Sequence, residues 1–289
     1  MYRDAVEQYG KYVNNPNHFD EDEAEYAFLL FWNQDYQKGY DYATRLLAQN
    51  PDNYSAMRFQ LMNAAQIPAL ADKMPAMALK LWTAHIADPV MRPFAPIDYN
   101  LAADQFSKAK DYEKAEQVLT EATKQFPNDP RFLQARAFMY LDQDNTQAAT
   151  QAYNEYMAKV SQPTAADLRT AMILNYAMAS QLKDTDATAA QQFATALNGY
   201  IAQAQQLYPE EPSTYFFMGR EKILNAPTAN AGSVAVDDFT KGIAAFEQIP
   251  ADKNRPYVNN AVTMYNYLAR AAAKAGNSAQ ARDYYNKVL

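Results

Sequence analysis

The sequence contains no cysteine, and only seven glycines and two histidines occur among its 289 residues. Without cysteine there is no disulfide bond, no thiolate nucleophile and no metal site with sulfur ligands. The lack of thiols suits the periplasm or envelope of a bacterium, toward which we lean, with the cytoplasm as the alternative. The scarcity of glycine and the lack of alternating β-branched residues favour helices over strands. No apolar segment reaches the ~20 residues that a membrane span needs.

Acidic residues outnumber basic ones. The sequence has 33 Asp and Glu against 26 Lys and Arg, which gives a formal net charge of −7. The basic residues are scattered and form no stripe of the kind that binds phosphates, so we expect no nucleic-acid partner. Hydrophobic residues make up 49% of the chain, which is enough for a large core and too many for a disordered protein.

The sequence shows no catalytic or metal-binding constellation. His18 and His85 lie far apart and have no obvious ligand partner, whereas a metal site needs three or four converging ligands. No phosphate-binding glycine loop, nucleophile elbow or H-E-x-x-H motif occurs. Carboxylate pairs such as Asp237 and Asp238 are better explained as charges near a helix start. We therefore predict a protein that is not an enzyme and uses no cofactor or metal.

Residues 96–129 contain two apolar faces at helical spacing. Their members are Tyr99, Ala102, Ala103 and Phe106 in the first half and Ala115, Leu119 and Ala122 in the second. Between the halves, Asp111 is suited to cap a second helix through its side-chain oxygen. Pro127 is expected to end that helix, because proline lacks an N–H and disfavours helix in the residue before it. The stretch therefore predicts two short amphipathic helices joined by a turn.

This stretch resembles the tetratricopeptide repeat (TPR), a helix–turn–helix unit of 34 residues. Related patterns recur along the chain, most clearly in the first, third, fourth and seventh repeats. The resemblance implies an all-α fold, a right-handed α-solenoid of TPR-like helix pairs whose first helices line a concave side. We assign one array over residues 1–289, with the back half of a repeat at 1–19 and repeats at about 20–53, 54–95, 96–129, 130–163, 164–211, 212–253 and 256–289.

Several local features depart from the simple pattern. Asp20 and Glu23 suit a capping box at the start of the first full repeat. Arg136 replaces an apolar residue, so we expect its stem to lie between helices and its head to reach water. The second repeat has a long turn, QIPALADKMP, and the fifth and sixth repeats carry the inserts KDTDAT and NAPTANAGSV. Inserts in such arrays often lie on the binding face, although a neutral surface loop is the plainer interpretation.

Both ends of the sequence lack the polar capping face that terminal repeats normally have. Met1 enters a pattern typical of mid-repeat, and Tyr285 and Val288 would leave apolar side chains uncovered at the other end. We therefore expect the sequence to be a piece of a longer protein, or to self-associate through its uncapped ends.

In TPR proteins the positions between the signature residues of the first helices point into the groove. Carried over by alignment, these positions are Arg58, Asn100, Asp104, Gln134, Phe138, Phe216, Arg220, Asn266 and Arg270. Arginine and asparagine at such positions suit hydrogen bonds to the backbone or carboxylate of an extended peptide. For any one of them, an ordinary solvated position is the alternative. Ala24 and Phe28 stand where one TPR subclass has residues that grip acidic C-terminal tails, which disfavours that ligand.

An aromatic cluster precedes the first turn. One helix cannot bury all of residues 27–32 against a single neighbour, so Phe28, Phe31 and Trp32 form either an exposed binding patch or a contact with the preceding helix.

These features favour a non-catalytic TPR scaffold that binds a peptide or protein segment in its concave groove. The alternative is an envelope-located solenoid that binds small molecules or glycans. The 22 tyrosines permit that alternative, because tyrosine rings stack on sugar faces.

Overall fold

The computed structural model describes residues 2–19 and 22–288, and within these ranges all regular structure is helical, with no strand. The prediction of an all-α fold is confirmed. The α-helices are α1 (Tyr2–Val13), α2 (Glu23–Trp32), α3 (Tyr36–Gln49), α4 (Tyr54–Ala64), α5 (Met74–Ala87), α6 (Pro96–Lys108), α7 (Tyr112–Gln125), α8 (Arg131–Asp142), α9 (Thr146–Lys159), α10 (Ala165–Leu182), α11 (Ala187–Leu207), α12 (Pro212–Asn225), α13 (Val236–Glu247), α14 (Val258–Lys274) and α15 (Ser278–Asn286). Two short 3₁₀ helices, η2 (Pro68–Lys73) and η3 (Arg255–Tyr257), lie in the longer connections.

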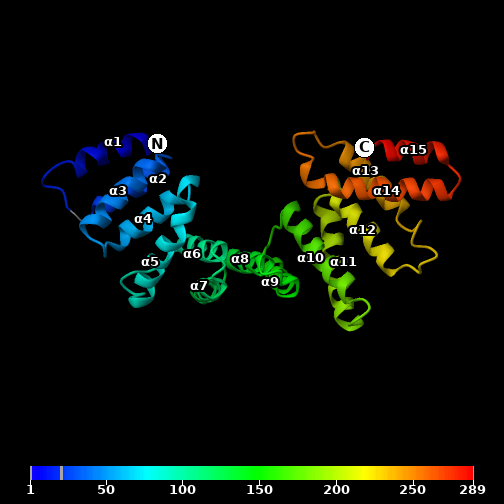
Figure 1. Ribbon diagram of the computed structural model, residues 1–289, viewed down its shortest axis with the longest axis horizontal. Helices are drawn as coiled ribbons and strands as arrows, with labels where there is room; N and C mark the ends of the chain where they lie inside the picture. The colour runs from blue at the N-terminus through cyan, green and yellow to red at the C-terminus, as the bar shows by residue number, and fades with distance from the viewer. Residues whose placement is uncertain (1, 20–21, 289) are drawn as a thin grey trace. The chain divides into compact units, whose positions relative to one another are not determined.

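The chain divides into two compact units, residues 1–144 (unit 1) and residues 145–289 (unit 2). Figure 1 shows unit 1 in blue to green, with α1–α8, and unit 2 in green to red, with α9–α15. Each unit is described by itself below. The assignment of one continuous array with the given repeat boundaries stays a prediction.

Four of the turns between consecutive helices share one geometry. Gln34, Lys110, Asp144 and Gly276 have positive φ angles of 65°, 60°, 56° and 79°. Each lies two residues after the end of a helix, which is where a left-handed residue commonly ends a helix. These turns belong to the first, third, fourth and seventh predicted repeats, in which the sequence pattern is clearest.

The residue after each left-handed turn is the N-cap of the next helix, and three of these four residues make a side-chain capping hydrogen bond. The side chain of Asp111 accepts a hydrogen bond from the backbone N–H of Lys114 at 3.3 Å, which confirms the predicted cap. Asn145 and Asn277 cap α9 and α15 in the same way. In contrast, α2 begins without a side-chain cap, and Asp20 of the expected capping box lies outside the described residues.

Small residues allow neighbouring helices to approach closely. A methyl group on Gly39 of α3 would overlap the buried amide of Asn63 on α4. In unit 2, a methyl group on Gly219 of α12 would overlap the ring of Phe239 on α13. Both glycines therefore mark places where side chains of one helix rest on the backbone of the next.

Each unit has a row of contacting first helices. In unit 1, α2 contacts α4, α4 contacts α6, and α6 contacts α8. In unit 2, α10 contacts α12 and α12 contacts α14. The second helices pack between them, for example α3 against α4 and α13 against α14. None of the described helices is long and apolar enough to cross a bilayer.

Candidate binding surfaces

The nine predicted groove residues all lie on first helices of the two units. Arg58 is on α4, Asn100 and Asp104 are on α6, and Gln134 and Phe138 are on α8. Phe216 and Arg220 are on α12, and Asn266 and Arg270 are on α14.

Arg58 takes part in a buried ion pair. Its Nε lies 2.8 Å from Oδ1 of Asp98, whose side chain is 0% exposed, while the side chain of Arg58 is 26% exposed. The other oxygen of Asp98 accepts a hydrogen bond from the backbone N–H of Ala95 at 2.7 Å. Burial raises the pKa of Asp98, and the guanidinium of Arg58 opposes that rise. Arg58 therefore joins α4 to α6, which limits what it can offer to a partner.

Asp104 lies at the rim of a pocket between α6 and the α4–α5 connection. The pocket has a volume of about 750 Å³. The remaining lining is mostly apolar and comes from residues 65–75 together with Leu101, Gln105, Lys108 and Ala109. The long turn QIPALADKMP forms η2 and one wall of this pocket, which was the sequence signal for it. Sequence analysis noted the turn but named none of its residues as a binding site.

The remaining groove positions of unit 1 lie on α6 and α8. Asn100 and Gln134 are partly buried, whereas the ring of Phe138 is exposed. Arg136, between them on α8, is mostly buried, and its Nη2 lies 3.1 Å from Oε1 of Glu116 on α7. Its head is therefore held by α7 instead of reaching free into water, which corrects the expectation for this residue.

In unit 2 the predicted groove residues differ in exposure. Phe216 is only 9% exposed, and its ring lies 5.1 Å from that of Phe217 and 6.1 Å from that of Phe239. Most of the Phe216 ring is therefore out of reach of a partner. Asn266 is partly buried and Arg270 is exposed.

Arg220 on α12 is held against an aromatic ring of the neighbouring helix. Its guanidinium carbon lies 4.8 Å from the centre of the Tyr176 ring on α10, a cation–π contact between neighbouring first helices. Its Nε is buried and has no hydrogen-bond partner among the described residues. That atom is closed to solvent, so a ligand can reach only the rest of the guanidinium, and the residue as a whole is partly buried.

The aromatic cluster of α2 is partly covered. The ring of Phe28 packs 5.2 Å from that of Phe59 on α4, and Trp32 stacks on Tyr2 of α1 at 5.8 Å. Phe31 lies 5.6 Å from Trp32, which is still 46% exposed. Tyr2 of α1 therefore covers part of this cluster, while much of Trp32 stays exposed to solvent.

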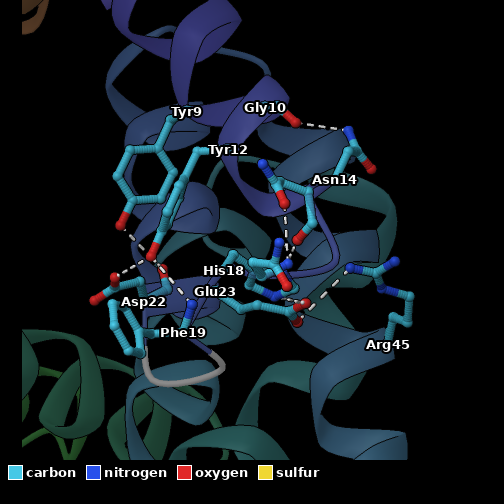
Figure 2. Close-up of polar contacts among 11 residues, drawn as sticks. Tyr9, Gly10, Tyr12, Asn14, His18, Phe19, Asp22, Glu23 and Arg45 are labelled. Carbon is cyan, nitrogen blue, oxygen red and sulfur yellow. Dashed lines mark hydrogen bonds and ion pairs between the residues drawn. The ribbon is translucent and has the colours of Figure 1, made fainter.

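Residues 14–19, which follow α1, and Asp22, which precedes α2, make polar contacts with the helices around them (Figure 2). The hydroxyl of Tyr12 donates to Oδ2 of Asp22 at 2.7 Å and accepts from the backbone N–H of Phe19 at 3.1 Å. Tyr9, one turn earlier on α1, donates to the carbonyl of Asp22 at 3.2 Å. These contacts hold α1 against the start of α2.

His18 lies in the same connection and is mostly buried. Its Nδ1 is 2.6 Å from the carbonyl oxygen of Asn15, and its Nε2 is 2.9 Å from Oε1 of Glu23. Figure 2 also shows Arg45 of α3 reaching toward Glu23, whose Oε2 lies 3.8 Å from Arg45 Nη2. The carboxylate of Glu23 thus joins the connection to α3.

His85 repeats this arrangement in α5. Its Nδ1 is 2.7 Å from the carbonyl oxygen of Arg92, and its Nε2 is 3.1 Å from Oε1 of Glu121 on α7. Its ring stacks on Phe94 at 4.1 Å. Both histidines therefore hold a connection in place with one nitrogen and a glutamate with the other. Among the described residues, no three His, Asp or Glu side chains gather as metal ligands.

Known structures resemble this arrangement of helices. The C-terminal part of a TPR repeat-containing protein from Cytophaga hutchinsonii gives a TM-score of 0.67 at 14% sequence identity, over 92% of this chain and 94% of that one. The fold is a TPR-like helical repeat. Human IFIT1, solved as a dimer with m7Gppp-AAAA, gives a TM-score of 0.44 at 12% identity over 99% and 76% of the two chains. A chain of the APC/C hetero-tetramer Cut9–Hcn1 gives 0.43 at 12% identity over 100% and 50%. No protein-family model and no curated protein sequence matches.

Proposed function

We propose that the protein is a non-catalytic scaffold that binds a peptide or protein segment along its rows of first helices. The observation that carries the proposal is Arg220, whose guanidinium is held over the ring of Tyr176 while the residue stays partly exposed. A side chain fixed in this way loses little entropy when it binds a backbone carbonyl or a carboxylate. Exposed Arg270 and partly buried Asn266 on the neighbouring α14 extend the hydrogen-bonding surface.

The test is peptide selection followed by substitution. Peptides of 12 residues selected from a random phage-displayed library would be synthesised, and their affinities measured by fluorescence anisotropy. We expect the double variant Arg220→Gln, Arg270→Ala to bind peptides that contact unit 2 at least ten-fold more weakly. Arg282→Ala, which removes an exposed cation from the second helix α15, is the matched control and should change affinity less than two-fold. A library that yields no binding peptide refutes the proposal.

A second candidate function is the binding of a glycan or another small polar molecule. The observation that favours it is a pocket of about 820 Å³ in unit 1, lined by Glu23, Tyr54, Ser55 and the carboxamides of Gln49 and Asn50, with three further residues. The hydroxyl of Tyr54 donates to the carbonyl of Pro93 at 2.9 Å, which fixes its ring. Carboxamides beside a fixed ring suit sugar hydroxyls and sugar faces. Binding on a glycan array that is lost in Gln49→Ala, Asn50→Ala, together with no selected peptide, would favour this function.

A further inference from the structure

The pocket between η2 and α6 has an apolar interior. Ile67 and Leu101 are partly buried and pack against the core of unit 1, and Met74 at the start of α5 is buried. All three line the pocket, together with Pro68 of η2 and Pro75 of α5. A volume of about 750 Å³ is within the usual range of ligand pockets. Burial of an apolar side chain of a ligand against such a surface is favourable.

Polar groups at this pocket are arranged to accept hydrogen bonds. Lys108 Nζ and Gln105 Nε2 both approach Oδ2 of Asp104, at 2.7 and 2.8 Å, which leaves Oδ1 of Asp104 as an acceptor. Gln105 is 4% exposed and donates through its amide nitrogen, so its amide oxygen is also left to accept. On the opposite wall, Asp72 of η2 is exposed and lines the same pocket. Lys108 also lines the pocket and pairs with Asp104, so Asp72, Asp104 and Lys108 together leave a net charge of −1 at the rim, which matches a ligand with N–H donors or a single positive charge.

The charge of unit 1 has the same sign as this rim. Residues 1–144 contain 14 Lys and Arg against 21 Asp and Glu, a net charge of −7, whereas residues 145–289 contain 12 of each and are neutral. The net charge of −7 therefore comes entirely from the unit that holds the pocket. Such a field attracts cationic partners and raises their association rate.

We propose that this pocket receives an apolar side chain of a bound peptide, with a lysine or arginine of the same peptide beside it. The apolar side chain lies on Ile67 and Leu101, and the cation pairs with Asp104 and Asp72. This inference rests on the proposed peptide-binding function and specifies the ligand that unit 1 selects.

Two variants test the pocket without touching the core. Ala71 is exposed on η2 and lines the pocket, so Ala71→Trp fills it; Ala76→Trp, at an exposed position of α5 outside it, is the matched control. The double variant Asp72→Asn, Asp104→Asn removes the rim charge, and Asp41→Asn, at an exposed position of α3, is its control.

The experiment uses the full chain and the random 12-residue peptide library described above. We expect selected peptides to carry Leu, Ile, Met or Phe beside Lys or Arg. Ala71→Trp should weaken their binding at least ten-fold, and both controls less than two-fold. The double Asp variant should also weaken binding at least ten-fold at low salt, with a smaller loss at 0.5 M NaCl because salt screens the charges.

Three results separate the possible failures. If selected peptides bind the pocket variants as tightly as wild type, and lose affinity in the Arg220, Arg270 variant, this inference is overturned and the scaffold function stands. If selected peptides are acidic, the inference is overturned as well. If no peptide is selected, the scaffold function itself fails, and with it the inference.

Discussion

The first helices α6 in unit 1 and α10 in unit 2 begin in the same way, yet the pKa values of their aspartates shift in opposite directions. Asp98 and Asp167 each occupy the third position of their helix, where the carboxylate accepts the N–H of the residue before the helix. The distances are 2.7 Å from Ala95 and 2.9 Å from Thr164. The pKa of Asp98 is nevertheless raised, and that of Asp167 is lowered.

The difference comes from the depth of burial and from the donors around each carboxylate. For both groups burial is the largest influence and raises the pKa, but Asp98 is 0% exposed whereas Asp167 is only partly buried. Asp98 has Arg58, one backbone N–H and, as the smallest influence, His85 to oppose burial. Asp167 accepts from the hydroxyl of Thr164 at 2.7 Å, from Tyr156 at 3.0 Å and from Tyr153 at 3.4 Å, besides the backbone of Thr164. A partly buried carboxylate with several neutral donors thus has a lowered pKa, whereas the pKa of a fully buried carboxylate stays raised even beside a cation.

The largest loss of stability is expected from Arg58→Ala. It leaves the 0% exposed carboxylate of Asp98 without its cation, which costs about 3–5 kcal/mol for a buried pair that loses one partner. Urea denaturation at pH 7 measures this loss in the free energy of unfolding. The loss should shrink as the pH falls, because Asp98 can then take up a proton.

Arg136→Ala is the control for this variant, since its partner Glu116 has a side chain that is 38% exposed. We expect that control to lose less than about 1 kcal/mol, as more exposed pairs do. Equal losses for the two arginines would contradict the distinction between a fully buried and a partly exposed carboxylate.

Local features of this fold could be read from the sequence, because their causes lie within a few residues. The cap at Asp111 and the turn at Gly276 and Asn277 follow from residues next to each other in the chain, and the structure has both. The helix pairs could be recognised for the same reason, since their apolar spacing is local.

Contacts between distant residues could not be read from one sequence. Arg58 was assigned to the groove, but its partner Asp98 lies 40 residues further on, and nothing local indicates the pair. Phe216 stands four residues before Arg220, so spacing alone puts both on one face. The close approach of Phe239 at Gly219 then brings a second ring against Phe216 and buries it. The pocket at Asp104 likewise depends on how η2 folds back toward α6.

Asp167→Asn should show the second-largest loss. A group whose pKa is lowered by folding stabilises the fold above its unfolded pKa of about 3.9, and that stability is lost as the pH falls through the folded pKa. We expect a loss of about 1–2 kcal/mol at pH 7, because the hydrogen bonds to a charged acceptor become bonds to a neutral one. The difference from wild type should fade below about pH 4. A loss that is equal at pH 7 and pH 3 would contradict the charge argument.

Tyr156→Phe tests the donors around Asp167 one at a time. It removes the hydroxyl that donates at 3.0 Å and should cost about 0.5–1.5 kcal/mol. It should also move the pKa of Asp167 upward, toward its ordinary value, as measured by carboxyl NMR titration. Tyr12→Phe, which removes a donor to Asp22 instead, is the matched control and should leave the pKa of Asp167 in place. An unchanged pKa of Asp167 in Tyr156→Phe would refute the role of that hydroxyl.

The smallest effect is expected from Asp98→Asn, although it breaks the same ion pair as Arg58→Ala. The cation left behind is 26% exposed and can turn toward water, and asparagine can still accept the N–H of Ala95. We expect a change in the free energy of unfolding within about 1 kcal/mol at pH 5, as for a site that leaves no buried charge.

The pH dependence of this variant should also differ from that of Asp167→Asn. Because folding raises the pKa of Asp98, the wild type binds an extra proton when folded and loses stability as the pH rises from about 4 through the folded pKa. The variant lacks this loss, so its stability relative to wild type should increase with pH over that window, opposite in slope to Asp167→Asn. Urea denaturation of both variants at pH 4, 5, 6 and 7 measures the two slopes. Slopes of the same sign would contradict the opposite pKa shifts of Asp98 and Asp167.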